Sequence, residues 1–436
     1  MRRRDMSLEA SEIFVPTHYP KHTLVKRQND HTNDVIDAIA DRSLVSISGP
    51  SKSGKTVLVE SAMANSSLIV VTGGGITCAD DIWAKVLDQL GTPLSRTVTN
   101  SSSSSNSKNI GGRVAIGPRV ANVQASTSLG DTENTSRQES RSFTRDSFNL
   151  VLDLVGSTGT VIFLDDFHYI PRNVQVIVAQ QVKELVRKKI QIVYAAVPYH
   201  ADDIIRANSD LQGRIYKIDL SYWSDDELMK IIDSGFEKLN FSCDLKYKNK
   251  LIKEAAGSPQ LMQSLCLSLC RIMNAREQCM EPTARDITPS EHEFFKTCEK
   301  VSNTIDYDNL IERLLEGAPT RGRERKLYQL KDGSTGDVYK ITLRALKQDP
   351  ARMIIRYNEL YTRVQNLCEE SPQTTGIMQA CAKISDISAK HLGFEKQSTD
   401  EDELEAVHLI EFDSEDAVIS IRDPYLLYAI RWSDKI

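Results

Sequence analysis

The stretch that decides the fold is rich in glycine and small polar residues and reads Gly49-Pro50-Ser51-Lys52-Ser53-Gly54-Lys55-Thr56. An apolar run, Leu44–Ser48, precedes it, and a helical pattern, Val57–Ala64, follows it. A strand, a glycine loop and a helix in this order are what a phosphate-binding loop requires. The sequence therefore predicts a nucleotide site at the end of a buried strand.

The residue types within this loop match the chemistry of a phosphate chain. Backbone N–H groups from Gly49 to Val57 would converge on the phosphates, where the dipole of the following helix also favours negative charge. Lys55 would reach the β- and γ-phosphates, and the Thr56 hydroxyl would ligate Mg²⁺. Gly49 and Gly54 permit the tight turn and the close backbone approach. ATP and Mg²⁺ are therefore the expected cofactors.

A second strand ends in two acids. The apolar run Val161–Leu164 leads into Asp165 and Asp166, which places both carboxylates at the carboxyl edge of a parallel sheet, where ligands bind. Downstream of a phosphate-binding loop, Asp165 is expected to hold Mg²⁺ through its water shell. Asp166 is placed to orient or deprotonate an attacking water. His168 is expected to be a structural or sensor residue rather than a base.

Length and composition limit the remaining possibilities. A chain of 436 residues should form two or three domains. The net charge of −6 argues against broad, non-specific binding of nucleic acid. The eight cysteines have irregular spacing and no histidine partners, so we expect reduced thiols and a cytoplasmic protein. No apolar run approaches the ~18–20 residues of a membrane span, so no membrane partner is expected.

Further strands and helices extend the nucleotide-binding core to residue 221. Strands are predicted at 67–72, 190–197 and 215–220, with a helix beginning at Phe143 before the acidic strand. Residues 92–142 are rich in Ser, Asn, Thr and Gly, which predicts a mobile insertion. Within it, Arg113–Val123 is either a disordered loop or a protruding hairpin for partner contact.

Two arginines near the last strand are candidate catalytic groups. Arg214 precedes the strand at 215–220, where an arginine can reach the phosphates of a neighbouring subunit. Arg206 is the second candidate, and a surface salt bridge is the alternative for both. Tyr199 and His200 stand where many ATPases carry a polar γ-phosphate sensor, although neither is the usual residue type.

A small helical lid is expected over residues 222–280. Ser224 and Glu227 form a predicted capping box for a helix reaching Leu239. Two more helices flank Gly257-Ser258-Pro259. Before the core, an N-terminal segment offers Tyr19, Val25 or Arg27 to wrap an adenine, or is a plain structural strap.

With these motifs in place, the segment from about Tyr19 to Met273 resembles the AAA+/STAND group of P-loop ATPases. The sequence Leu-Asp-Asp-Phe-His at 164–168 and the Gly-x-Pro motif at 257–259 are similar to those of the STAND branch, whereas Arg214 looks like an AAA+ arginine finger. The resemblance implies that Pro259 lies near the adenine. It also implies ATP/ADP binding that switches conformation and assembly, with slow hydrolysis that resets the switch.

The C-terminal third predicts a helical connector and a winged helix. Residues 281–335 contain helical patterns and a basic run with Arg321, Arg323 and Arg325. Residues 336–436 predict three helices, two alternating strands at 406–412 and 417–422, and a final helix from Pro424. The presumed reading helix, 376–392, carries few bases, which favours a regulatory role over DNA readout.

The leading hypothesis is an α/β ATPase that acts as a molecular switch. It would self-associate and signal to an effector protein, with prokaryotic stress or anti-phage defence as the natural setting. The alternative is a DNA-loading AAA+ ATPase of the replication-initiator or transposition-regulator type. A nucleotide-binding scaffold without turnover is the third possibility.

Overall fold

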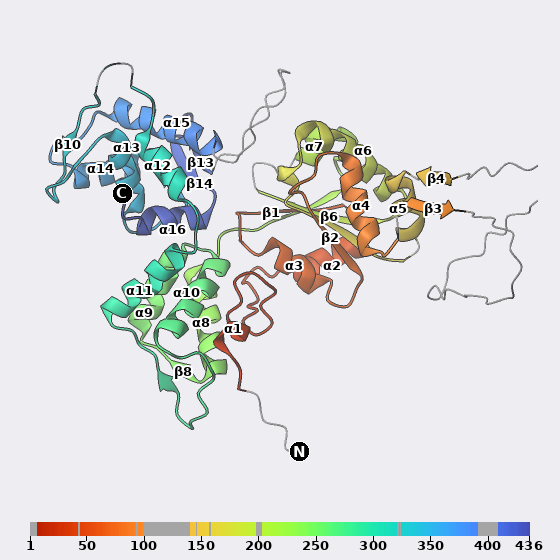
Figure 1. Cartoon of the computed structure of the whole chain (residues 1–436), viewed down its shortest axis with the longest axis horizontal. Helices are drawn as coiled ribbons and strands as arrows, with labels where there is room; N and C mark the ends of the chain where they lie inside the picture. The colour runs from red at the N-terminus through yellow and green to blue at the C-terminus, as the bar shows by residue number, and fades with distance from the viewer. Residues whose placement is uncertain are drawn as a thin grey trace, which may run out of the picture.

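The computed structural model describes residues 7–41, 44–92, 95–99, 140–144, 146–156, 158–197, 203–320, 322, 324–390 and 409–436. Three parts follow one another along the chain: a sheet flanked by helices, a helical bundle below it, and a C-terminal domain (Figure 1). The segment 113–123, Tyr199, His200, Arg321 and Arg323 lie outside the described residues. Among the described helices, none is both long and apolar enough to cross a bilayer.

The domain predicted to bind the nucleotide is built on a parallel sheet, as expected from the sequence. In the described part of the chain its strands run in the order β2-β5-β6-β1-β7, and every neighbouring pair is parallel. Their bounds are β1 Leu44–Ser48, β2 Leu68–Thr72, β5 Val161–Asp165, β6 Gln191–Ala196 and β7 Ile215–Asp219. The chain leaves β1 for the far edge and later returns to the other side of β1. The carboxyl end of β1 is therefore a switch point in the strand order, where a ligand crevice forms.

Helices cover both faces of this sheet because its strands are apolar on both sides. One face packs against α2 (Thr32–Ala40) and α3 (Lys55–Ala62), and Val45, Ile47 and Phe163 point into that core. The other face packs against α4 (Ala79–Gln89), α5 (Ser147–Val155) and α6 (Arg172–Arg187). The short α7 (Asp203–Ala207) follows β6.

The predicted helix at Phe143 begins too early. Residues Ser140–Thr144 form strand β4, which pairs in antiparallel fashion with β3, Ser95–Thr99. Helix α5 begins at Ser147 because the Asp146 side chain accepts a hydrogen bond from the Phe148 N–H and caps its first turn. The two ends of the Ser/Asn-rich segment are therefore paired strands.

The segment predicted as a lid forms a helical bundle of α8 (Asp225–Leu239), α9 (Leu245–Ala255) and α10 (Pro259–Ile272). Helix α11 (Glu291–Ser302), which the sequence analysis assigned to the connector, packs in the same core and is counted with the lid below. The capping box of Ser224 and Glu227 is confirmed. Helix α1 (Ala10–Ile13) and Phe14 also pack in this core, so the N-terminal strap is attached to the lid. The short strands β8 (Phe241–Ser242) and β9 (Arg285–Asp286) close its lower end.

The C-terminal domain has a mixed architecture. Its core contains α12 (Asp308–Glu316), α13 (Val338–Lys347), α14 (Tyr357–Leu367) and α15 (Thr374–Lys390). Strands β12 (Ile354–Arg356), β14 (Val418–Ile421) and β13 (Ile410–Asp413) form an antiparallel sheet, and β10 (Tyr328–Gln329) pairs with β11 (Thr335–Gly336). The helices and the β13–β14 hairpin occur in the predicted order. The winged-helix assignment stays a prediction.

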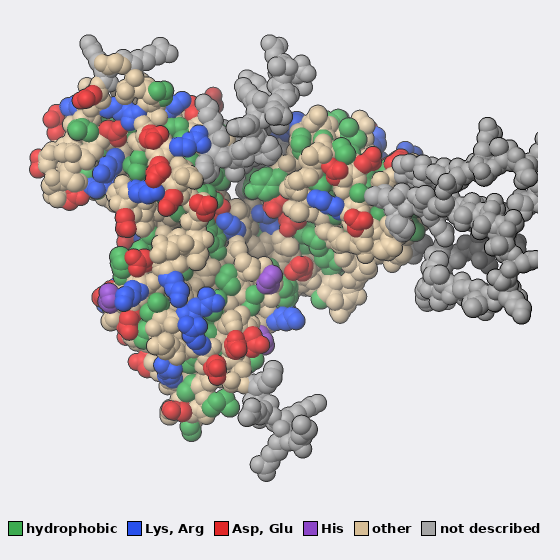
Figure 2. Space-filling model, viewed as in Figure 1, with side chains coloured by type: hydrophobic (Ala, Val, Ile, Leu, Met, Phe, Trp, Pro, Cys, Tyr) green, Lys and Arg blue, Asp and Glu red, His purple; other side chains and the backbone are tan. Residues whose placement is uncertain are grey.

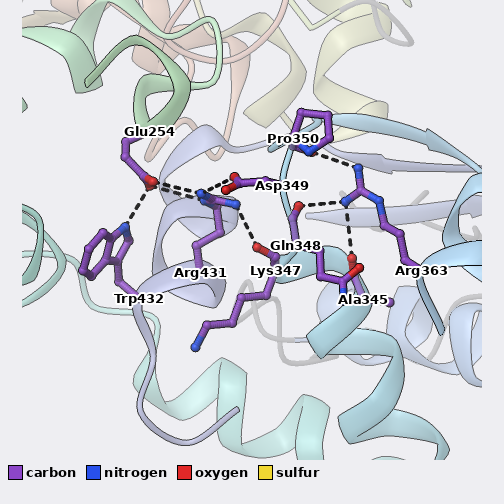
Figure 3. Close-up of polar contacts among 9 residues, drawn as sticks. All are labelled: Glu254, Ala345, Lys347, Gln348, Asp349, Pro350, Arg363, Arg431 and Trp432. Carbon is purple, nitrogen blue, oxygen red and sulfur yellow. Dashed lines mark hydrogen bonds and ion pairs between the residues drawn. The ribbon is translucent and has the colours of Figure 1, made fainter. Parts of the chain in front are cut away.

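Helix α16 (Pro424–Trp432) joins the lid to the C-terminal domain (Figure 3). The Arg431 guanidinium donates to both carboxylate oxygens of Glu254 in α9, at 2.9 and 3.3 Å, and Trp432 Nε1 donates to the same carboxylate at 2.9 Å. Arg431 also donates to the Lys347 carbonyl and to Asp349. The side chains of Arg431 and Glu254 are 8% and 12% exposed, so this ion pair is largely shielded from water.

The packing of Phe14 on Gly235 gives a test of how the strap is held. A Cβ added to Gly235 would lie 2.3 Å from two ring atoms of Phe14, and that ring is fully buried. Gly235→Ala should therefore lower the free energy of unfolding by about 1–3 kcal/mol, as overpacked cores do. In an exposed part of a helix, replacing glycine by alanine would instead raise the free energy of unfolding by about 1 kcal/mol.

Urea denaturation of Gly235→Ala beside Lys238→Ala, an exposed position on the same helix, measures the difference. Equal or greater stability of Gly235→Ala would show that Phe14 can move away.

Candidate functional site

The glycine loop turns sharply at the end of β1. Gly49 lies so close to β7 that an added Cβ would be 2.8 Å from the Cβ of Leu220. Gly54 has φ +97, a conformation that L side chains rarely adopt, and stands immediately before α3. The Ser53 Oγ atom is buried and has no hydrogen-bond partner among the described residues. A buried hydroxyl of this kind beside a helix N-terminus fits a phosphate ligand.

Lys55 lies inside this loop with only 6% of its surface exposed. Its Nζ donates to the carbonyl oxygens of Gly49 at 3.0 Å and Pro50 at 2.9 Å. Burial lowers the pKa of Lys55, while the nearby carboxylates of Asp166 and Asp165 oppose that shift. The loop therefore holds a buried ammonium group at the start of α3, where phosphate oxygens can replace its carbonyl partners.

The adjacent strand end supplies oxygen ligands. The Thr56 hydroxyl donates to Asp165 Oδ2 at 2.5 Å, which joins the first turn of α3 to the carboxyl end of β5. A hydroxyl and a carboxylate in contact are the hard ligands that Mg²⁺ prefers. No cluster of three His, Cys, Asp or Glu side chains suited to a metal occurs among the described residues. The pair fits Mg²⁺ only if phosphate oxygens and waters complete the coordination.

Asp166 has an unusual backbone. Its φ of 54 and ψ of 43 are left-handed, and its N–H donates to Asp165 Oδ1 at 2.9 Å. A Cβ on Gly73 would be 2.4 Å from the Asp166 carbonyl oxygen, so the loop after β2 must have glycine there. Burial and the Asp165 charge raise the pKa of Asp166, and Lys55 opposes the shift. Burial and Asp165 also raise the pKa of Glu60, which lies on α3 beside the site.

These groups line one cavity of about 870 Å³, a size suited to a nucleotide. Its walls include the loop from Ser51 to Val57, the strap from Val15 to Thr32 and the start of α10 at Pro259. Tyr19, Val25 and Arg27, named above as candidate base contacts, all lie on the strap wall. The strap, Pro259 and the carboxylates of Asp165 and Asp166 therefore all line the same cavity.

Trp223 fixes the junction between sheet and lid. Its Nε1 donates to the Ser53 carbonyl at 2.9 Å, and the Arg27 guanidinium lies 5.4 Å from the centre of its ring. Arg27 also donates to the Ser221 carbonyl and pairs with Glu227. The loop, the strap and the lid therefore meet at one tryptophan, which the sequence analysis did not single out.

The structure separates the predicted site residues into two groups. The loop residues, Val57, Asp165, Asp166 and Pro259 gather around the cavity, with Gly49 and Pro50 binding Lys55 through their carbonyls. His168 also lines the cavity and is buried. Arg206 and Arg214 are exposed and lie outside the cavity. If either acts on a phosphate, that phosphate belongs to another subunit.

The sequence analysis missed the cavity residues from the C-terminal domain, Leu409, Arg422 and Asp423. Lys52 Nζ donates to both oxygens of Asp423, at 2.9 and 2.8 Å. Since these residues are 371 positions apart, no local pattern indicated the contact. The only available signal was the Asp-Pro pair at the start of α16, which predicts a helix cap and nothing about its neighbour.

Neither a protein-family model nor a curated protein matches this sequence. Among solved structures the chain is similar to the ORC2 protein of Aeropyrum pernix (ADPNP–ADP complexes), with 12% identity, a TM-score of 0.47 and 96% of each chain covered. It is also similar to A. pernix ORC1 in complex with DNA, with 11% identity, a TM-score of 0.46, and 99% of this chain and 98% of that one covered. The RuvB Holliday junction branch migration motor of Thermotoga maritima has 12% identity and a TM-score of 0.38, over 69% of this chain and 83% of that one.

The raised pKa of Asp166 predicts a pH-dependent cost to stability. The folded-state pKa of Asp166 lies above the unfolded value of about 3.9. The free energy of unfolding therefore falls as pH rises from the unfolded pKa through the folded pKa. Asn carries no charge and tolerates the left-handed backbone. Asp166→Asn should therefore raise the free energy of unfolding at pH 7 by about 1 kcal/mol, a common size for such replacements.

Thermal or urea unfolding at pH 7 and below about pH 4, where the unfolded carboxyl is largely protonated, measures this effect. The gain should shrink at the lower pH. A stability difference that is the same at both pH values would contradict the electrostatic origin.

Proposed function

We propose that this protein binds and hydrolyses ATP with Mg²⁺ and acts as a nucleotide-dependent molecular switch. The observation that carries the proposal is the convergence of a buried lysine and a hydroxyl–carboxylate pair on one cavity. Lys55, Thr56 and Asp165 all line this cavity. The strap and the start of α10 in the lid line it too, and the strap and the lid share one packed core. Nucleotide binding can therefore bias the arrangement of the lid relative to the sheet.

Each polar group has a distinct role in this proposal. Backbone N–H groups of the loop and Lys55 bind the phosphates, and Thr56 and Asp165 hold Mg²⁺, which would neutralise phosphate charge when bound. Asp166 orients the attacking water and accepts its proton, since a raised pKa makes a carboxylate a better base. Pro259 and the strap contact the base.

Self-association would complete the site. Arg214 is exposed at the foot of β7, away from its own cavity, so it can serve only the phosphates of a neighbouring subunit. An arginine supplied in this way stabilises transition-state charge. In the proposed switch, hydrolysis is slow, an effector protein receives the signal, and the setting is stress or anti-phage defence.

DNA loading remains the alternative function. Arg325, which belongs to the basic run and is among the described residues, makes contacts with other residues of this protein. Its guanidinium donates to Asp337 Oδ2 at 2.7 Å and lies 4.6 Å from the centre of the Tyr339 ring. Acidic and basic side chains are intermingled over the visible face of the C-terminal domain (Figure 2). Both observations favour the switch, and a steeply salt-dependent affinity for duplex DNA would favour the alternative.

Lys55 provides the direct test of nucleotide binding. Lys55→Ala should weaken MgATP and MgADP binding by roughly 10- to 150-fold, because a hydrogen bond to a charged group is worth about 1.5–3 kcal/mol. Isothermal titration calorimetry measures this, with Lys188→Ala, an exposed lysine that immediately follows α6, as the control. A wild-type protein that binds neither nucleotide would refute the proposal. Wild-type binding without turnover would indicate the scaffold instead.

Complementation between variants tests Arg214. Arg214→Ala should bind ATP normally but hydrolyse it at least about 1,000-fold more slowly, the usual effect of a missing arginine finger. Mixing it with Lys55→Ala should restore part of the activity. In mixed oligomers the intact loop of one subunit meets the intact Arg214 of the other.

Steady-state phosphate release over a range of mixing ratios measures this recovery. Full activity of Arg214→Ala alone would show that the arginine is a surface residue. No recovery on mixing would show that it does not act between subunits.

A further inference from the structure

One contact joins the phosphate-binding loop to the C-terminal domain. Lys52 has a left-handed backbone, φ 60, and its ammonium group binds the Asp423 carboxylate with both distances below 3 Å. The Tyr425 ring lies 4.1 Å from the same Nζ. The side chains of Lys52 and Asp423 are 29% and 12% exposed, so the pair is largely removed from solvent.

Asp423 is held firmly on its own side of this contact. Its Oδ2 accepts a hydrogen bond from the Tyr307 hydroxyl at 2.8 Å, and its Oδ1 accepts one from the Tyr425 N–H at 2.8 Å. The second bond caps the N-terminus of α16, next to Pro424. The carboxylate is therefore fixed by its own domain and extended toward Lys52.

The contact lies on the wall of the candidate nucleotide cavity. Lys52 and Asp423 both line it, together with Lys55, Asp165 and Asp166. A phosphate chain in the loop would bring negative charge next to the Asp423 carboxylate and would attract the Lys52 ammonium group. The Asp423 carboxylate and the phosphates would therefore compete for the same ammonium group, that of Lys52.

We propose that Asp423 closes the C-terminal domain onto the phosphate-binding loop and that the phosphates of a bound nucleotide compete with it for Lys52. The proposal rests on the proposed nucleotide site and adds a regulatory residue to it. By linkage, a contact that opposes nucleotide binding is itself weakened by nucleotide binding to the same extent. Nucleotide binding thus releases the C-terminal domain from the loop.

Helix α16 transmits this release to the lid. Asp423 caps the first turn of the helix, and its last turn carries Arg431 and Trp432, which bind Glu254 of the lid (Figure 3). The Tyr428 hydroxyl, between these ends, donates to the Cys298 carbonyl of α11 at 2.8 Å. The lid and the C-terminal domain therefore move together when Asp423 leaves Lys52.

The test uses Asp423→Asn, which removes the charge but keeps a good N-cap residue for α16. The full-length variant should bind MgADP and MgATP about tenfold more tightly than wild type, within the usual range of couplings between linked sites. Asp416→Asn removes one exposed carboxylate from the β13–β14 turn of the same domain and serves as the matched control. Isothermal titration calorimetry measures all three proteins.

Hydrogen exchange supplies a second readout, and its comparison of variants with wild type needs no nucleotide. Backbone amides of residues 422–432 should exchange faster in Asp423→Asn than in wild type, and MgATP should produce the same increase in wild type. Lys52→Met, which removes the other partner, should show the increase without ligand. This variant keeps the proposal testable if Asp423→Asn folds poorly.

The outcomes separate this inference from the proposed function. If Asp423→Asn and Asp416→Asn bind nucleotide as wild type does, while Lys55→Ala does not bind, the competition is refuted and the nucleotide site stands. If wild type itself binds no nucleotide, both fail. Unchanged exchange in Asp423→Asn and in Lys52→Met would also refute the closing role.

Discussion

The burial of the Lys55 ammonium group is the constraint on which the site depends. A cation with 6% exposure is unfavourable unless oxygen atoms surround it. The loop provides two carbonyls, and Asp165 at the end of β5 and Asp166 just after it provide two nearby carboxylates, so the ends of two strands must meet around one side chain. Strand β6 lies between β1 and β5 and sets their spacing. The parallel sheet is therefore what makes a buried lysine tolerable there.

Local sequence signals predicted the parts of the fold that depend on neighbouring residues. Strand β1 has the predicted bounds because an apolar run ends at a glycine loop, and α8 begins at its capping box because Ser224 and Glu227 satisfy each other's N–H groups. The start of α5 was missed because Phe143 is apolar and suits a helix or a strand equally well. Its pairing with Arg96 in β3, across a long insertion, decided the outcome.

The grouping of the candidate site residues was predictable to the same extent. Glycine spacing and the position of paired acids predicted that the loop and Asp165 lie together, since both are local patterns at strand ends, and the two line one cavity. The contribution of the C-terminal domain was not predictable, because Lys52 and Asp423 each have an ordinary local explanation, in a loop and in a helix cap. Only the packing of α16 against both the lid and the loop brings them together. Long-range ion pairs leave no period or spacing in a sequence.

The left-handed backbone at residue 166 restricts which acid can stand there. At φ 54, short polar side chains such as Asp and Asn are tolerated far better than longer ones, because they hydrogen-bond locally. The Asp166 carbonyl also packs directly against Gly73, where an added Cβ would lie 2.4 Å from its oxygen. An aspartate rather than a glutamate after Asp165 therefore has a local physical cause. The backbone conformation at the end of this strand therefore explains the second aspartate without reference to a particular family.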